Sequence, residues 1–260
     1  MKEQVFSLFP QTTGKIALMF TGGVESYLLG KLAVQLYGVD NVIFVVWLMD
    51  EYNVFYRKPE KRDRVERDFR TSVENVGGKH MFVVDNTQYH QFPGHMIDKT
   101  FAVLQSKHPD IKYLIGGYNN IHRESLEVFN VLRATQDMSD LSRRGRLEVF
   151  SNKDKYPELV EFLTECDGMV YFVEEDFTKK TLDDLVTFTE REYFAAPLQN
   201  LTKTQVVMLY DELGWLTDLF KSNSCNRKGH KHHCGVCGNC LARRVAIRNA
   251  GINDETEYLV

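Results

Sequence analysis

The chain has 260 residues, of which 43% are hydrophobic and 26% are charged. These proportions are ordinary for a folded globular protein and exclude a disordered, collagen-like or disulfide-scaffold chain. The length predicts one domain of roughly 200 residues with a small appendage, or two modest domains. A formal net charge of −4 argues against a generally basic protein that coats nucleic acid, although it leaves room for a local basic patch.

The sequence predicts neither a membrane-spanning segment nor a signal peptide. Its longest apolar run, residues 42–49, has eight residues, whereas a transmembrane helix needs about 20. Residues 1–4 (Met-Lys-Glu-Gln) lack the apolar stretch and the cleavage site of a signal peptide. We therefore expect a cytoplasmic protein.

The first half of the chain alternates short apolar runs with helical patterns. Residues 41–49, for example, form a continuous β-branched and aromatic run that is typical of a strand buried on both faces. We predict strands at 15–20, 41–49, 80–84 and 112–115, and helices at 26–37, 60–76 and 93–105. This alternation predicts an α/β fold with a doubly wound parallel sheet, which binds ligands at the carboxyl ends of its strands.

The second half has a less regular pattern. We predict helices at 121–138, 157–164, 181–193 and 202–213, and a strand at 169–173. The last of these helices begins with Thr202 and Gln205, which have the spacing of a capping box. From residue 219 to residue 253 there are seven Lys or Arg and no acidic residue. We expect an α/β domain at 1–195 and a small helical module at 196–260 that packs on it.

Residues 21–26 (Thr-Gly-Gly-Val-Glu-Ser) lie between a predicted buried strand and a predicted helix. Two glycines allow the backbone to approach an anion, and the following helix presents free N–H groups and the positive end of its dipole. Ser26 can donate its hydroxyl, and Glu25 can hold a magnesium ion, which favours carboxylate and phosphate oxygens. The alternative is a tight turn without a ligand. The segment matches neither a Walker A loop nor the Rossmann fingerprint.

Four of the five cysteines lie close together in the sequence, at Cys225, Cys234, Cys237 and Cys240. In a cytoplasmic chain such a cluster indicates a metal site rather than disulfides. Four thiolates fill the tetrahedral shell of zinc and leave no open position, so the expected role is structural. An iron–sulfur cluster is the main alternative. Histidines in the long gap could each replace a cysteine, although we expect them to be exposed. They are His230, His232 and His233.

These motifs resemble those of a known enzyme family. Segment 21–26 resembles the S-G-G-x-D-S motif of the PP-loop ATP pyrophosphatases, which cleave ATP to AMP and pyrophosphate. The cysteine spacing, with Ser224 before it and Ala-Gly-Ile-Asn-Asp at 250–254 after it, is similar to that of the 7-cyano-7-deazaguanine synthase (QueC or ExsB) family. Further similar segments are Ala-Pro-Leu at 196–198, Leu-Thr-Lys at 201–203 and Glu-Leu-Gly at 212–214. The resemblance therefore covers both ends of the chain.

The resemblance implies an adenine nucleotide alpha hydrolase-like fold and an ATP-dependent carbon–nitrogen ligase. In the family, a carboxylate attacks the α-phosphate of ATP, pyrophosphate leaves, and ammonia displaces AMP to give an amide. A second ATP then converts the amide into the nitrile of 7-cyano-7-deazaguanine. For this chain the resemblance implies 7-carboxy-7-deazaguanine and ammonia as substrates in queuosine-type nucleoside modification. It also implies ATP, Mg²⁺ and Zn²⁺ as cofactors, and we expect a homodimer.

The resemblance also implies a role for individual residues. Glu25 would orient magnesium and Lys203 would neutralise the phosphates, which makes both catalytic. The predicted ATP contacts are Phe20, Thr21, Gly22, Gly23, Val24, Glu25, Ser26, Trp47, Leu48 and Gly116. The predicted substrate contacts are Asp50, Tyr118, Asn119 and Arg123. The predicted zinc ligands are Cys225, Cys234, Cys237 and Cys240.

The sequence departs from the family at several positions. Thr21 and Glu25 stand where the family has Ser and Asp, and Glu reaches one methylene further. The family's Gly-Gln after the second strand is absent, and its substrate segment after the fourth strand is not recognisable. Two alternatives stay open: a QueC-like ligase that couples the carboxylate to an amine on a protein or nucleic acid, and a zinc-stabilised nucleotide- or nucleic-acid-binding protein without catalysis. The basic run at 221–248 suits phosphates, a substrate carboxylate or nucleic acid.

Overall fold

The computed structural model describes residues 1–48, 59–85, 93–117, 147–157, 159–161, 191–225 and 232–260. The helix predicted at 121–138 and the strand predicted at 169–173 lie outside these residues. Most of the helix predicted at 181–193 also lies outside them, and its last three residues form a turn rather than a helix.

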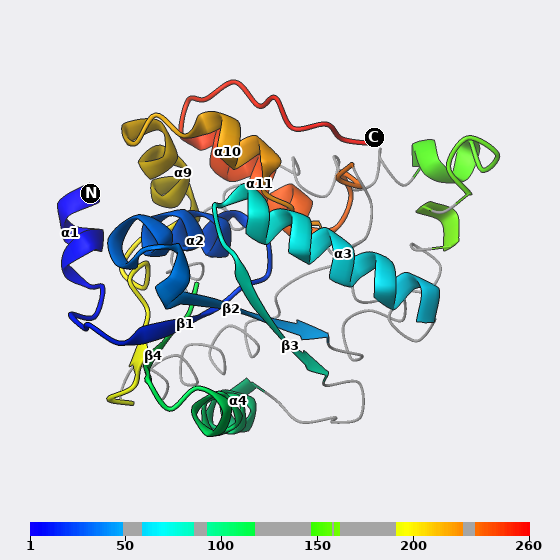
Figure 1. Cartoon of the computed structure of the whole chain (residues 1–260). Helices are drawn as coiled ribbons and strands as arrows, with labels where there is room; N and C mark the ends of the chain where they lie inside the picture. Colours follow the sequence, from blue (N-terminus) through cyan, green and yellow to red (C-terminus); the bar gives the residue numbers. More distant parts are fainter. Residues whose placement is uncertain (49–58, 86–92, 118–146, 158, 162–190, 226–231) are drawn as a thin grey trace.

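A five-stranded parallel sheet forms the centre of the fold (Figure 1). Its strands are β1 (Lys15–Met19), β2 (Val42–Leu48), β3 (His80–Asp85), β4 (Ile111–Ile115) and β5 (Phe194–Ala195). They lie in the order β3-β2-β1-β4-β5, and each neighbouring pair is parallel. The first four strands confirm the predicted ones. The sequence analysis missed β5, because a strand of two residues carries no periodicity that a pattern could reveal.

The labelled helices are α1 (Lys2–Ser7), α2 (Val24–Tyr37), the 3-10 helix η1 (Val39–Asn41), α3 (Pro59–Asn75), α4 (Pro93–Lys107), α9 (Lys203–Glu212), α10 (Leu216–Lys221) and α11 (Gly238–Asn249). Residues 147–151, 157 and 159–161 are also helical. The predicted capping box of α9 is present. Gln205 N–H donates to Thr202 Oγ1 at 3.2 Å, and Thr202 N–H donates to Gln205 Oε1 at 2.9 Å. Among the described helices, none has the length and apolar character needed to cross a membrane.

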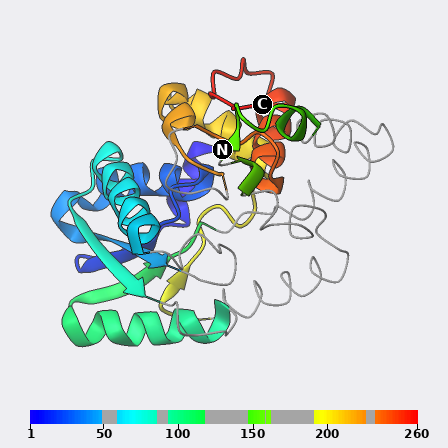
Figure 2. The same cartoon turned by 90° about the vertical axis from the view of Figure 1, so that its right-hand side faces the viewer.

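Helices cover both faces of the sheet (Figure 2). Ile16 and Leu18 of β1 belong to a buried cluster with residues of α2, α3 and α9, whereas Ala17 belongs to a separate cluster with residues of α4. On β2, Phe44 belongs to the first of these clusters and Val45 to the second. Successive side chains of a strand point to opposite faces, so strands covered on both sides are apolar throughout. The doubly wound α/β fold is therefore confirmed.

The C-terminal helices pack directly on the sheet domain. Tyr210 of α9 and Ile247 of α11 lie in the same buried cluster as Leu28 and Leu32 of α2. This cluster continues across the predicted boundary between 1–195 and 196–260. The division of the chain at that point stays a prediction.

The strand order reverses at β1, because β2 and β3 lie on one side of it and β4 and β5 on the other. In open α/β sheets, ligands bind at the carboxyl edge beside such a reversal. The Gly22–Gly23 turn follows β1 and Gly117 follows β4. The fold thus brings two glycine-containing turns to the edge where a ligand is expected.

Candidate active site and metal centre

The turn between β1 and α2 has the geometry of an anion-binding loop. Gly22 has a φ of +70°, a left-handed conformation that residues with a Cβ rarely adopt. Gly23 is the N-cap of α2, and no side chain caps this end of the helix. Its first turn is therefore open to an anion, which the positive end of the helix dipole attracts.

Hydrogen bonds between the two ends of this loop hold its shape. Thr21 N–H donates to Ser26 Oγ at 3.1 Å, and the hydroxyls of Thr21 and Ser26 are 3.0 Å apart. Ser26 Oγ–H donates to Gly23 O at 3.3 Å. The hydroxyl of Ser26, which the sequence suggested as a donor to a ligand, thus also braces the loop from within.

Gly117 lies against the first turn of α2. A Cβ at this position would come within 3.2 Å of Ser26 N and 3.4 Å of Glu25 Cβ. These distances are tighter than side chains normally accept, so glycine permits the close approach. Gly116 N–H donates to Ala195 O at 2.9 Å, which ties the end of β4 to β5. The chain that leaves β4 is therefore held directly beside the loop.

Glu25 and Lys203, the two predicted catalytic residues, form an ion pair. Lys203 Nζ lies 3.0 Å from Glu25 Oε1, and their side chains are only 12% and 13% exposed. Glu25 is favoured in the first turn of α2 by the helix dipole, whereas Lys203 is disfavoured in the first turn of α9. The carboxylate of Glu25 offsets the unfavourable interaction of Lys203 with the dipole of α9. The fold thus places one carboxylate and one ammonium beside the anion-binding loop.

Two residues that sequence analysis did not assign fasten the C-terminal segment to this loop. Asn223 N–H donates to Gly22 O at 2.6 Å. Tyr210 O–H donates to Val24 O at 2.8 Å, and both residues are buried. Burial raises the pKa of Tyr210 well above its ordinary value, so the phenol keeps the proton that it donates. The loop is thus held by α9 and by the segment after α10.

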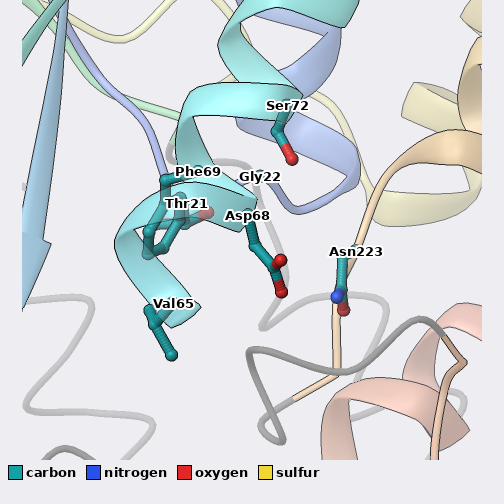
Figure 3. A pocket seen from close by; sticks show the side chains of 7 residues that line it. All are labelled: Thr21, Gly22, Val65, Asp68, Phe69, Ser72 and Asn223. Carbon is teal, nitrogen blue, oxygen red and sulfur yellow. The ribbon is translucent and has the colours of Figure 1, made fainter. Parts of the chain in front are cut away.

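A small pocket is lined in part by Gly22 (Figure 3). Its lining residues come from α3, from the loop and from the segment after α10, and they are Thr21, Gly22, Val65, Asp68, Phe69, Ser72 and Asn223. Ser72 Oγ lies 3.8 Å from the place where a Cβ on Gly22 would stand. The pocket therefore adds a carboxylate, an amide and a hydroxyl to the surroundings of the loop.

The four predicted metal ligands lie together in the fold. The sulfur atoms of Cys225, Cys234, Cys237 and Cys240 all lie within 4.8 Å of one another, and all four residues are buried. Zn–S bonds of about 2.3 Å in a tetrahedron place the sulfurs about 3.8 Å apart. The observed distance from Cys234 Sγ to Cys240 Sγ is 3.9 Å. The cluster therefore fits the geometry of a closed structural zinc site.

Backbone N–H groups donate hydrogen bonds to two sulfur atoms of this cluster. Cys237 N–H donates to Cys234 Sγ at 3.3 Å, and Cys234 N–H donates to Cys225 Sγ at 3.4 Å. Hydrogen bonds from the neighbouring thiols, above all from Cys234, lower the pKa of Cys225 well below its ordinary value, whereas hydrogen bonds with Cys225 and with other thiols of the cluster raise the pKa of Cys234 and Cys240. A metal ion binds thiolates and releases their protons, so this arrangement suits metal binding.

The histidines of the gap do not behave alike, and the expectation that all three are exposed is wrong for His233. This residue is buried, with its Nδ1 3.8 Å from Cys240 Sγ and its Nε2 3.2 Å from Ser222 O. It contacts the cluster from outside the set of four sulfurs. His232 Nδ1 instead lies 2.7 Å from Glu257 Oε2, and His230 lies outside the described residues.

A fully buried arginine anchors the segment that links α10 to the cluster. Arg243 of α11 donates to Leu219 O at 2.6 Å and to Ser222 Oγ at 2.8 Å. It also donates to Thr256 Oγ1 at 3.1 Å. Leu219 and Ser222 lie at the C-terminal end of α10, where the helix dipole favours a cation. Arg243 thus fixes the start of the segment that contacts the loop.

The remaining predicted ATP contacts can act mainly through the backbone. The side chains of Phe20, Val24 and Leu48 are buried in the core of the sheet domain. Trp47 is half-buried on β2, and its Nε1 has no hydrogen-bond partner among the described residues. The predicted substrate contacts lie outside the described residues and are Asp50, Tyr118, Asn119 and Arg123.

Comparison with known proteins agrees with the C-terminal features. The family model of the queuosine biosynthesis protein QueC matches residues 152–251. A 7-cyano-7-deazaguanine synthase of Porphyromonas gingivalis is 46% identical over 63 residues, which cover 24% of this chain and 27% of that protein. A 7-cyano-7-deazaguanine synthase of Methanococcus vannielii is 43% identical over 72 residues, covering 25% of this chain and 30% of that protein. Residues 152–251 of this chain are therefore similar to the QueC family.

The matches to these curated relatives span only about a quarter to a third of their length. A similar match, 44% identical over 63 residues, covers 26% of a 7-cyano-7-deazaguanine synthase of Chelativorans sp.. QueC is a PP-loop family, in agreement with the parallel sheet and with the turn between β1 and α2. The comparisons therefore bear most strongly on the region that carries the cysteine cluster.

Proposed function

We propose that this protein is an ATP-dependent ligase that adenylates a carboxylate and converts it with ammonia into an amide. The proposed substrate is 7-carboxy-7-deazaguanine, and a second round with ATP would give the nitrile, 7-cyano-7-deazaguanine, for queuosine-type nucleoside modification. The names of the curated relatives support this reaction. The cysteine cluster and the loop after β1 support the same assignment.

The single observation that carries the proposal is the position of the Glu25–Lys203 ion pair beside the open N-terminus of α2. The helix N-terminus attracts the phosphates of ATP. Lys203 can turn from Glu25 toward a phosphate oxygen, since Lys presents three donors on a flexible stem. The carboxylate of Glu25 would then serve as a ligand for a cation. Lys203 and a cation held by Glu25 would offset part of the negative charge of a polyphosphate.

The reaction divides into two group transfers. An oxygen of the substrate carboxylate attacks the α-phosphorus, and the bond from that phosphorus to the β-phosphate oxygen breaks, so pyrophosphate leaves. The nitrogen of ammonia then attacks the acyl carbon and loses a proton. AMP leaves, which gives the amide. In the second round the amide oxygen attacks the α-phosphorus of another ATP, and a second pyrophosphate leaves. The adenylated oxygen then departs as part of AMP, and loss of the two protons on nitrogen leaves the nitrile.

The chain's own residues contribute position and charge to these steps. The loop backbone and Lys203 would neutralise the charge that develops on the leaving pyrophosphate, which is the main catalytic effect expected in adenylate formation. Glu25 would hold a magnesium ion, which would supply further charge neutralisation. The four cysteines would fill all the positions of a zinc ion, so that its role would be to hold the C-terminal segment in place.

The proposal is tested by incubating the protein with Mg-ATP, 7-carboxy-7-deazaguanine and ammonium, followed by mass spectrometry of the products. We expect AMP, pyrophosphate and the amide, with the nitrile at longer times. A reaction without ammonium and a reaction without the carboxylate serve as controls. Pyrophosphate release that requires the carboxylate but yields no ammonia product would instead favour an amine acceptor on a macromolecule. Absence of both AMP and pyrophosphate would contradict a ligase function on this substrate.

A further inference from the structure

The hydroxyl of Ser224 is buried next to the loop and lacks a partner. Ser224 is 6% exposed, and its Oγ makes no hydrogen bond to any of the residues that the structure describes. A buried hydroxyl without a partner destabilises a folded protein. The nearby Ser222, which is also buried, shows the usual arrangement, since its Oγ donates to Leu219 O and accepts from Arg243.

The unpartnered hydroxyl faces the open side of Gly23. A Cβ built on Gly23 would lie 3.9 Å from Ser224 Oγ, 3.4 Å from Thr21 Oγ1 and 3.9 Å from Glu25 Oε2. None of these distances is a clash, so there is room for an atom at this point. Polar atoms from the loop, from α2 and from the segment after α10 thus surround a small space at the N-terminus of α2.

The position of Ser224 is fixed from both sides. Asn223 N–H donates to Gly22 O at 2.6 Å, and Cys225 N–H donates to Asn223 Oδ1 at 3.0 Å. Cys225 belongs to the cysteine cluster. Ser224 therefore lies between a residue bonded to the loop and a predicted metal ligand, so its hydroxyl is held in place before any ligand arrives.

We propose that Ser224 is a phosphate-binding residue, whose hydroxyl donates a hydrogen bond to a phosphate oxygen bound at the Gly22–Gly23 turn. This inference rests on the proposed function, because it takes the anion to be the polyphosphate of ATP. The C-terminal segment then contributes a direct contact to the nucleotide in addition to its structural role. The cysteine cluster positions that contact through Cys225.

The test is Ser224→Ala in the metal-containing protein, with isothermal titration of pyrophosphate and of α,β-methylene-ATP in the presence of Mg²⁺. We expect both affinities to fall by about tenfold, the effect of a lost hydrogen bond to a charged group. Thermal unfolding of the ligand-free variant should occur at or above the wild-type temperature, because no internal hydrogen bond is lost. Ser222→Ala is the matched comparison: it removes a partnered hydroxyl and should lower the unfolding temperature.

Ser106→Ala on α4, an exposed position on the other face of the sheet, should leave both affinities unchanged. If the wild-type protein binds both ligands and Ser224→Ala binds them with the same affinity, the Ser224 inference is overturned and the proposed function still stands. A ligand-free Ser224→Ala protein that is destabilised as strongly as Ser222→Ala would also overturn it, since the hydroxyl would then have an internal partner. Failure of the wild-type protein to bind either ligand would overturn both proposals.

Discussion

The ammonium of Lys203 lies 3.0 Å from a carboxylate oxygen of Glu25, although the two residues belong to helices from opposite ends of the chain. Both lie in the first turn of their helix, and both side chains are largely buried. An ion pair in such a place costs desolvation energy, and each partner is needed to compensate the other. The stability of the folded protein is therefore sensitive to the loss of either charge.

Glu25→Gln should reduce turnover by at least about 100-fold, because it removes the carboxylate proposed to hold magnesium against the departing pyrophosphate. Affinity for ATP without magnesium should barely change. The variant should also lose about 1–3 kcal/mol of unfolding free energy, because Lys203 loses its carboxylate partner in a buried site. Steady-state pyrophosphate release and urea unfolding measure the two effects.

The double variant Glu25→Gln with Lys203→Met separates these two effects. It removes the buried lysine charge together with the carboxylate, so we expect stability to return toward that of the wild type while turnover stays low. A near-wild-type rate for the single variant would show that Glu25 serves only the helix dipole, and would contradict its proposed role in holding magnesium.

Gly23→Val should abolish nucleotide binding and leave the unfolding temperature of the ligand-free protein within about 2 °C of the wild type. Gly23 has φ −74° and ψ 172°, which valine can adopt, and a Cβ there meets no atom closer than 3.4 Å. The side chain would instead fill the space proposed for a phosphate. Gly22→Val is the contrasting variant, since φ +70° should make it lower stability as well. An ATP-dependent thermal shift of wild-type size in Gly23→Val would show that the loop is misassigned.

One zinc ion per chain should accompany the purified protein, bound by the four buried sulfurs. Cys237→Ser should lose the metal and unfold or aggregate rather than show a purely catalytic defect, because metal binding supplies folding energy. Elemental analysis of protein purified without chelator gives the stoichiometry. Iron in place of zinc, or far less than one equivalent of zinc, would contradict the assignment.

The stability of the protein should fall at alkaline pH, in part through Tyr37. Burial, with a smaller contribution from Tyr113, raises the pKa of Tyr37 to about 12, and its O–H donates to Pro10 O at 2.7 Å. The folded pKa lies above the unfolded value of about 10, so the stabilisation is complete below pH 10 and is lost as the pH rises toward 12. Urea unfolding at several pH values should show a smaller decline for Tyr37→Phe than for the wild type. Equal declines would exclude a contribution from this residue.

Local sequence signals predicted the structure correctly wherever it depends on residues that are close together along the chain. The capping box at Thr202 and Gln205 involves residues three apart, and the Gly22–Gly23 turn follows directly from the absence of two side chains. The apolar runs of β1 and β2 predicted strands buried on both faces, since only that environment accepts apolar residues at successive positions. The cysteine spacing likewise indicated a cluster, because thiolates so close in sequence can reach one metal ion.

The tertiary structure alone decided which distant residues meet at the site. The contact of Asn223 with Gly22 and the position of Ser224 beside Gly23 depend on how α10 and α11 pack on α2, which no local pattern encodes. The same holds for the buried Arg243, whose sequence context is that of an exposed basic run. Helical periodicity and spacing report the neighbours of a residue along the chain. Burial and hydrogen-bond partners depend on the packing of whole elements, so the sequence by itself determined the fold class and the metal site, and only packing decided how the cysteine cluster reaches the loop.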